Sequence, residues 1–342
     1  MATNPKLEFF RFKLNHKKEN FKTFKDFAIL ELGGSKSLSD EKTVELCFKH
    51  FMKSLSSEHA KDDKIKKTIK VENKKSINKH LDKKPTYNSA NHTIFGIING
   101  GPYGRERIIS NNDDDEDSSA LGLNKSVLLY FYFFIYLPPD HNEGFFMIHS
   151  NSDEETITTL FRRYITYVFK GKSFNKATAI EFCPKSFQEE FLKGAILKSM
   201  IFKSSFIDNI PTTNSISQLF QNYNIKIEAT PRNKNIPGID AQGFLAKLSK
   251  KIFGSKNQER VLEDFEETKV ILKSDITSSQ KTFEWNTKDK DFIPVVYLKG
   301  RIIKKNADDT PDFEELEKYC LTVFKDEILE EIRPDLYAVN YK

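Results

Sequence analysis

The lysines of this 342-residue sequence are its most evident chemical feature, because they cluster rather than spread evenly along the chain. The segment 61–84 holds ten lysines and four acidic residues, a net charge of +6, whereas the whole chain carries +5. Clustered ammonium groups bind phosphates by displacing counterions from nucleic acid. The segment therefore predicts a phosphate-binding surface, with a solvated helix or a linker as the alternative.

Smaller basic groups lie elsewhere in the chain. Arg105 and Arg107 follow a glycine-rich stretch, Arg162 and Arg163 are adjacent on a predicted helix, and a second predicted helix, 240–253, has a lysine-rich face. No helix-turn-helix, RNP or zinc-finger signature accompanies them, so they predict backbone contacts without sequence readout. A basic helix can also bind an acidic protein or a membrane surface. The candidate nucleic-acid-binding residues are Lys66, Lys67, Lys70, Lys74, Lys75, Arg105, Arg107, Arg162, Arg163, Lys247, Lys250 and Lys251.

Residues that could catalyse a reaction form no complete motif. A metal-dependent nuclease of the PD-(D/E)xK kind needs an acidic residue, then a strand that carries an acid and a lysine two positions apart. Asp63 followed by the stretch 69–74 (IKVENK) fits this spacing, but the supporting strand is short and polar. There is also no G-x-S-x-G nucleophile elbow. A divergent nuclease is kept as an alternative, and no catalytic residue is assigned.

The histidines and cysteines predict no metal site. Cys47 and His50 lie one helical turn apart, but Cys47 belongs to an apolar helix face and no second pair accompanies them. The three cysteines are far apart, which indicates reduced thiols rather than disulfides or a zinc ribbon. The first residues lack the apolar core of a signal peptide. We expect a cytoplasmic protein without a metal or cofactor.

The glycine-rich block between residues 100 and 104 resembles a phosphate loop only superficially. Its sequence, GGPYG, matches neither GxxxxGK[ST] nor GxGxxG, and the residues after it are not helical in pattern. Glycines readily adopt turn dihedrals. The block therefore predicts the turn of a hairpin that joins strands at 93–99 and 105–110.

The elements that must position these residues are organised around Val127–His149. Val127–Leu137 is an uninterrupted run of apolar, mostly aromatic residues, which is typical of a strand buried on both faces. Pro138 and Pro139 end it, and Phe145–His149 returns as a second apolar strand. This pattern predicts a central hairpin, with a buried helix as the alternative. The run is too short to span a membrane as a helix.

Further strands are predicted at 7–14 and 24–32, and helices after Ser39, after a capping box at Ser152 and Glu155, and after Thr310. The fold class is α+β, with mixed or antiparallel sheets and packed amphipathic helices. We expect two domains: residues 1–170 with the central aromatic hairpin and the basic insertion 61–84, and residues 171–342, which end in a long helix.

Three stretches are similar to uncharacterised bacterial anti-phage defence proteins. They are KLEFFRFKL near the start, IFGIINGGPYGRERII, and the aromatic strand with its PPD turn and EGFFMIHS strand. The resemblance covers the N-terminal half only and brings no catalytic residue. It implies a component of a defence system that senses or binds phage nucleic acid.

The sequence therefore favours a non-enzymatic protein of a bacterial anti-phage defence or mobile-element system that binds the nucleic-acid backbone. The alternatives are a divergent metal-dependent nuclease and a self-associating scaffold protein. We expect nucleic acid as the main partner, and a protein of the same system or a second copy as further partners, without membrane insertion. The residues do not distinguish DNA from RNA.

Overall fold

The chain forms two compact units, one of residues 1–182 and 296–342 and the other of residues 183–295. The computed structural model describes residues 4–71, 83–110, 118–152, 154–193, 195–204, 225–232, 267–274, 279–284, 296–302, 304, 306 and 310–337. The expected division near residue 171 differs from this one. The strand β10 (Phe174–Phe182) lies beyond that point but pairs along most of its length with β1 (Lys6–His16).

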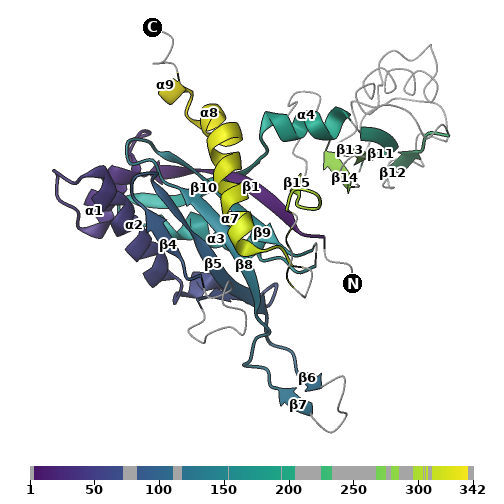
Figure 1. Ribbon diagram of the computed structural model, residues 1–342, viewed down its shortest axis with the longest axis horizontal. Helices are drawn as coiled ribbons and strands as arrows, with labels where there is room; N and C mark the ends of the chain where they lie inside the picture. The colour runs from purple at the N-terminus through teal and green to yellow at the C-terminus, as the bar shows by residue number, and fades with distance from the viewer. Residues whose placement is uncertain are drawn as a thin grey trace, which may run out of the picture. The chain divides into compact units, whose positions relative to one another are not determined.

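The first unit is built on a curled antiparallel sheet with the strand order β10-β1-β9-β8-β5-β3-β2 (Figure 1). Two short strands lie off this path, since β15 pairs with β1 and β4 pairs with β5. The remaining strands are β2 (Lys61–Asp62), β3 (Lys67–Lys70), β4 (Thr86–Asn88), β5 (Thr93–Pro102), β8 (Leu129–Tyr136), β9 (Glu143–Ser150) and β15 (Val296–Tyr297). The α+β fold class predicted from the sequence is confirmed.

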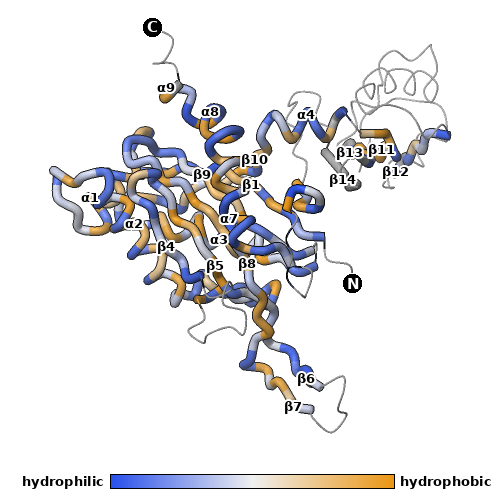
Figure 2. Tube along the Cα trace, in the orientation of Figure 1, coloured by the Kyte–Doolittle hydropathy of each residue, from blue (hydrophilic) through white to orange (hydrophobic). Residues whose placement is uncertain are grey.

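The central hairpin is also confirmed, because β8 and β9 pair in the middle of the sheet with Phe133 opposite Ile148. Nearly all of their residues are buried. Figure 2 shows the same concentration of hydrophobic residues in the middle strands. A strand pair that is apolar on both faces needs a covering layer on each side.

One face of the sheet is covered by three helices, α1 (Phe24–Leu32), α2 (Asp40–Ser54) and α3 (Thr158–Val168). The amphipathic face predicted for α3 packs on the sheet: the ring of Phe161 lies 5.4 Å from Phe133 and 5.6 Å from Phe146, between ring centres. The predicted capping box is misplaced, however. Ser152 accepts the N–H of Glu155 at 3.0 Å, but α3 begins only at Thr158.

The prediction of a strand at 24–32 is wrong, since these residues form α1. Thr23 caps the helix by accepting the N–H of Asp26 at 3.2 Å, and the Asp26 carboxylate accepts the N–H of Thr23 at 2.9 Å. Gly33 ends it in the left-handed conformation, with φ of 76°. Its buried residues, Phe24, Phe27 and Ala28, follow helical spacing.

The other face is covered by the C-terminal helices, α7 (Phe313–Val323), a π-helical segment (Phe324–Ile328), α8 (Leu329–Ile332) and α9 (Pro334–Tyr337). Phe324 packs against Phe134 and Tyr136 of β8, with ring centres 5.0 and 4.9 Å apart. The helix cap is Asp312, which accepts the N–H groups of two glutamates, rather than the predicted Thr310. No helix in the described part of the chain is long and apolar enough to cross a membrane.

The second unit contains α4 (Lys185–Lys193) and an antiparallel sheet with the order β12-β11-β13-β14. Its strands are β11 (Ala195–Ser204), β12 (Ile225–Ala229), β13 (Glu267–Ser274) and β14 (Ser279–Glu284). The helix predicted at 240–253, with Lys247, Lys250 and Lys251, lies outside the described residues, and so do Lys74 and Lys75.

The hairpin turn predicted at residues 100–104 does not form. The strand β5 continues to Pro102, and β6 (Arg107–Ser110) pairs with β7 (Ser118–Leu121) instead of returning along β5. Gly100 and Gly101 instead allow other parts of the chain to pack closely against β5. A Cβ on Gly101 would lie 1.9 Å from the carbonyl oxygen of Val127, and one on Gly100 would lie 2.7 Å from a methyl carbon of Ile157.

Gly101→Ala is therefore expected to destabilise the protein by about 1–3 kcal/mol, because the new methyl group meets backbone that cannot easily move. The matched control is Gly122→Ala, at a position where a Cβ would meet no atom within 4 Å. Urea unfolding of both variants and the parent measures the difference. Equal stability of the two variants would show that the chain accommodates a methyl group at Gly101 without strain.

Candidate nucleic-acid interface

The first part of the lysine-rich segment is a folded hairpin, not a helix or a linker. β2 and β3 pair at the edge of the large sheet, with Lys61 opposite Thr68. Thr68 and Ile69 are buried, so the hairpin is anchored in the core. Its turn is held by the Asp62 carboxylate, which accepts the N–H groups of Lys64 and Ile65 at 2.9 and 3.2 Å. The side chains of Lys61, Lys64 and Lys66 are consequently presented to solvent.

Asp62 is neutralised inside this arrangement. Arg163 of α3 donates to its carboxylate at 2.5 Å and also to the carbonyl oxygen of Lys61. Burial disfavours the carboxylate, but the N–H groups of Ile65 and Lys64 and the Arg163 charge outweigh it and lower the pKa of Asp62. The predicted site residue Arg163 thus holds the hairpin in place and cancels an acid that would otherwise oppose phosphate.

Asp63 has partners within the same region. It accepts the hydroxyl of Tyr103 at 2.6 Å and lies 3.7 Å from the ammonium group of Lys66. These two contacts lower the pKa of Asp63, with the Tyr103 hydrogen bond contributing most. The same hydrogen bond raises the pKa of Tyr103 to about 12, so the hydroxyl remains a donor at neutral pH.

Tyr103 also brings distant parts of the predicted site together. Its N–H donates to the carbonyl oxygen of Lys66 at 2.9 Å, which places the chain leading to Arg105 and Arg107 beside the hairpin. Arg105 is exposed and Arg107 is half-buried. Neither guanidinium forms an ion pair with a described residue. The β2–β3 basic surface is defined here as Lys61, Lys64, Lys66, Arg105 and Arg107.

Two predicted site residues have structural roles instead. Arg162 donates to the carbonyl oxygen of Ala179 at 2.6 Å, lies 3.5 Å from the Glu181 carboxylate and stacks 5.4 Å above the ring of Phe10. Lys67 donates to the carbonyl oxygen of Thr156 at 2.6 Å, and burial lowers its pKa. Lys70 is exposed at the other end of β3, opposite Asn99, so it stands apart from the basic surface.

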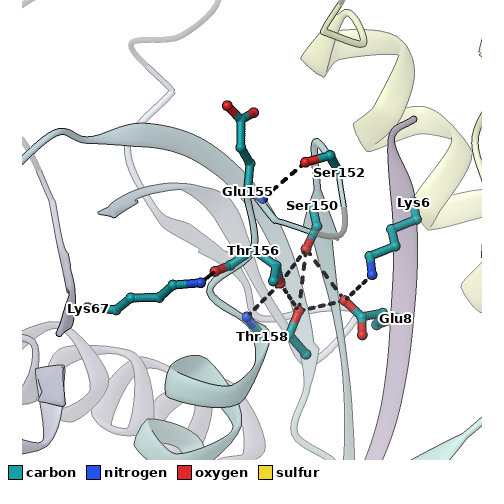
Figure 3. Close-up of polar contacts among 8 residues, drawn as sticks. All are labelled: Lys6, Glu8, Lys67, Ser150, Ser152, Glu155, Thr156 and Thr158. Carbon is teal, nitrogen blue, oxygen red and sulfur yellow. Dashed lines mark hydrogen bonds and ion pairs between the residues drawn. The ribbon is translucent and has the colours of Figure 1, made fainter. Parts of the chain in front are cut away.

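Lys67 reaches a polar network that fixes the start of α3 (Figure 3). Thr158 donates to the Glu8 carboxylate at 2.6 Å, and Ser150 donates to the hydroxyl of Thr156 at 2.9 Å. The hydroxyl groups are therefore occupied by one another and by one carboxylate. This network therefore positions the start of α3.

An aromatic pair adjoins the basic surface and was not predicted from the sequence. His59 stacks on Tyr167 of α3 with ring centres 4.1 Å apart, and the ammonium group of Lys170 lies 5.9 Å from the same Tyr167 ring. Arg163 lies on the same face of α3 as Tyr167 and contacts Asp62 of the hairpin. The spacing of Arg163 and Tyr167, four residues apart on one face of α3, was the available signal.

Within the described residues, no group of three or more histidine, cysteine, aspartate or glutamate side chains could hold a metal ion. Glu72 and Lys74 of the nuclease-like stretch lie outside those residues. Cys47 is buried, which raises the pKa of its thiol to about 12, and His50 bonds to the carbonyl oxygen of Val168 at 2.6 Å. Cys47 and His50 therefore take part in the packing of the core.

No protein-family model matches the chain, and neither the curated proteins nor the solved structures give a significant match. The candidate interface therefore depends on the geometry and charge of this chain's own residues.

One titratable group is buried on the opposite face of the sheet. His149 of β9 is fully buried, meets the ring of Phe313 edge-on at 5.6 Å, and has no hydrogen-bond partner among the described residues at either ring nitrogen. Burial lowers the pKa of His149 to about 3. The folded protein therefore keeps this imidazole neutral through the range in which an unfolded histidine, with a pKa of about 6.5, takes up a proton.

Because the unfolded state binds the proton and the folded state does not, stability falls as the pH is lowered through about 6.5. We expect His149 to account for a loss of about 2 kcal/mol between pH 7.5 and pH 5. His149→Phe should remove this component, and His141→Gln, a change at the hairpin turn, serves as the control. Urea unfolding at both pH values measures it. An equal loss in the parent and His149→Phe would mean that His149 is not the responsible group.

Proposed function

We propose that this chain binds the phosphate backbone of nucleic acid through the β2–β3 basic surface. The observation that supports the proposal is the placement of three exposed lysines on a hairpin whose neighbouring acids have partners of their own. Asp62 is paired with Arg163, and Asp63 accepts the hydroxyl of Tyr103. Of the three lysines, Lys66 also lies 3.7 Å from the Asp63 carboxylate, so a phosphate must share it with that acid. Cations fixed on a folded element bind phosphates with a smaller ordering cost than cations on a flexible chain.

The proposed contacts are with phosphates rather than with bases. Lysine ammonium groups act as point charges, and arginine can add bidentate hydrogen bonds to phosphate oxygens. Neither carries sequence information when it meets the backbone. Binding is therefore proposed to be independent of sequence. Exposed Glu58, Asp63 and Glu106 lie on or beside the surface, but they are fewer than its five basic residues.

The biological setting follows from the resemblance of three stretches in the N-terminal half to bacterial anti-phage defence proteins. On the basis of that resemblance, we propose a non-enzymatic, cytoplasmic component of a bacterial defence or mobile-element system. Its contribution would be to hold nucleic acid for the other proteins of that system.

The test replaces the three hairpin lysines together, as Lys61→Gln, Lys64→Gln and Lys66→Asn. Asparagine is used at Lys66 because that residue is left-handed, with φ of 51°. If each lysine contacts a phosphate, the slope of log affinity against log salt should become shallower by about 3 for duplex DNA, since each contact contributes about 0.9. Fluorescence anisotropy with labelled duplex DNA, single-stranded DNA and duplex RNA at several salt concentrations measures this slope and identifies the preferred form.

The matched control replaces three exposed lysines far from the surface, Lys18, Lys36 and Lys318, with glutamine, which changes the net charge by the same amount. It should leave the slope nearly unchanged. Urea unfolding confirms that both triple variants remain folded. The proposal fails if the control weakens binding as much as the hairpin variant, or if the parent binds none of the three nucleic acids at low salt.

A further inference from the structure

Beside the β2–β3 basic surface, two aromatic rings from different elements are stacked on each other. His59 belongs to the short 3-10 helix η1 (Glu58–Ala60), which directly precedes β2, and Tyr167 lies on α3. Their ring centres are 4.1 Å apart, and the ring planes are 15° from parallel. Tyr167 therefore covers one face of the imidazole. We name His59 and Tyr167 the aromatic stack.

The second face of the imidazole is available to a ligand. The His59 side chain is 35% exposed, and no further ring is packed on it within the part of the chain that the structure describes. Ala60, the next residue, is buried, so the backbone at His59 is anchored in the core. Tyr167 is fixed on α3, where Arg163, one turn earlier, is paired with Asp62. The stack is therefore a preformed flat surface, and a ligand need not order it.

Cations accompany both rings of the aromatic stack. Lys61, a member of the β2–β3 basic surface, follows His59 by two residues and is exposed. Lys170 is also exposed, and its ammonium group lies 5.9 Å from the centre of the Tyr167 ring. One acid is present as well, because the Glu58 carboxylate lies 3.8 Å from Nε2 of His59. Aromatic rings among cations are the arrangement by which proteins bind single-stranded nucleic acid, since the bases stack on the rings while the cations meet the phosphates.

We propose that the aromatic stack receives an unpaired nucleobase, so that the nucleic acid bound at this surface is single-stranded. The inference rests on the proposed function, because the phosphate contacts of the β2–β3 basic surface hold the strand beside the stack. Within a duplex both faces of a base are covered by its neighbours, whereas an unpaired base can lay a free face on His59. Every base has such a face, so the preference is for strand form and not for sequence.

Abasic strands separate stacking from phosphate contacts. A labelled oligothymidine and an abasic oligonucleotide of equal length carry the same phosphates, but only the first has bases. Fluorescence anisotropy of the parent should show that the oligothymidine binds at least about fivefold more tightly, which corresponds to one stacked base. An oligouridine probe measured in parallel shows whether RNA is bound as well as DNA. This comparison uses the unaltered protein, so it does not depend on how a variant folds.

Substitution of His59 assigns the stacking to this ring. His59→Ala should weaken oligothymidine binding at least about fivefold, yet leave the abasic strand and duplex DNA unaffected and the salt slope unchanged, since no lysine is removed. His59→Phe restores an aromatic ring without a titratable group and should recover the affinity. His141→Ala, which removes another half-buried histidine at the β8–β9 turn, is the matched control and should bind like the parent.

The outcomes separate this inference from the proposed function. If the parent binds oligothymidine and abasic strands equally, or if His59→Ala weakens all probes alike, the inference is overturned. The proposed phosphate binding then still stands, provided that the hairpin lysines determine the salt slope. A parent that binds none of the probes at low salt removes both. Selective loss of oligothymidine binding in His59→Ala, with recovery in His59→Phe, supports the unpaired base as the ligand of the aromatic stack.

Discussion

The structure depends on the need to cover both faces of the β8–β9 hairpin. Its strands are apolar at almost every position, so neither face can be left in water. The helices α1 to α3, which follow one another within the first 168 residues, cover one face. The other face is covered by the C-terminal helices, where Phe324, the first residue of the π-helical segment after α7, lies against Phe134 and Phe145. This constraint explains why the chain returns to the first unit after the second unit has been completed.

The C-terminal helices are held to the first unit by one buried cation, Arg333. The guanidinium of Arg333, just after α8, forms two hydrogen bonds with Asp140, at 3.0 and 2.8 Å, and further bonds with Asp335. It also donates to the hydroxyl of Tyr136 at 3.3 Å. Burying a charge is unfavourable unless it is fully paired, and these contacts raise the pKa of Arg333 further, with Asp335 contributing most. Asp140 belongs to the turn after the two prolines, so the turn that ends β8 also receives the C-terminal helices.

The sequence predicted the elements whose signals are local and strong. The aromatic run with its proline turn predicted the hairpin, and the spacing of the apolar residues predicted the face of α3 that packs on it. Helix α1 was missed because nine residues rich in phenylalanine, isoleucine and leucine suggest a strand, although Thr23 and Asp26 formed a recognisable cap. The pairing of β6 with β7 was missed because Gly100 and Gly101 were interpreted as turn residues, whereas they permit Val127 and Ile157 to approach β5. Only long-range packing distinguishes these two uses of glycine.

In the candidate site, too, the roles of single side chains depend on long-range contacts that the sequence does not reveal. The density of lysines pointed to the segment 61–84, but its neighbours Lys66 and Lys67 lie in different surroundings. Lys66 stays exposed in the turn, whereas Lys67 begins β3 and reaches the carbonyl oxygen of Thr156, 89 residues away. The Asp62 carboxylate is likewise paired with Arg163, 101 residues away. Charge counted along the sequence treats all of these groups alike. The surface potential that a phosphate meets depends on which of these charged groups the fold has already paired. A few exposed lysines beside paired acids are therefore better support for the proposed binding than the net charge of +6 counted over the segment 61–84.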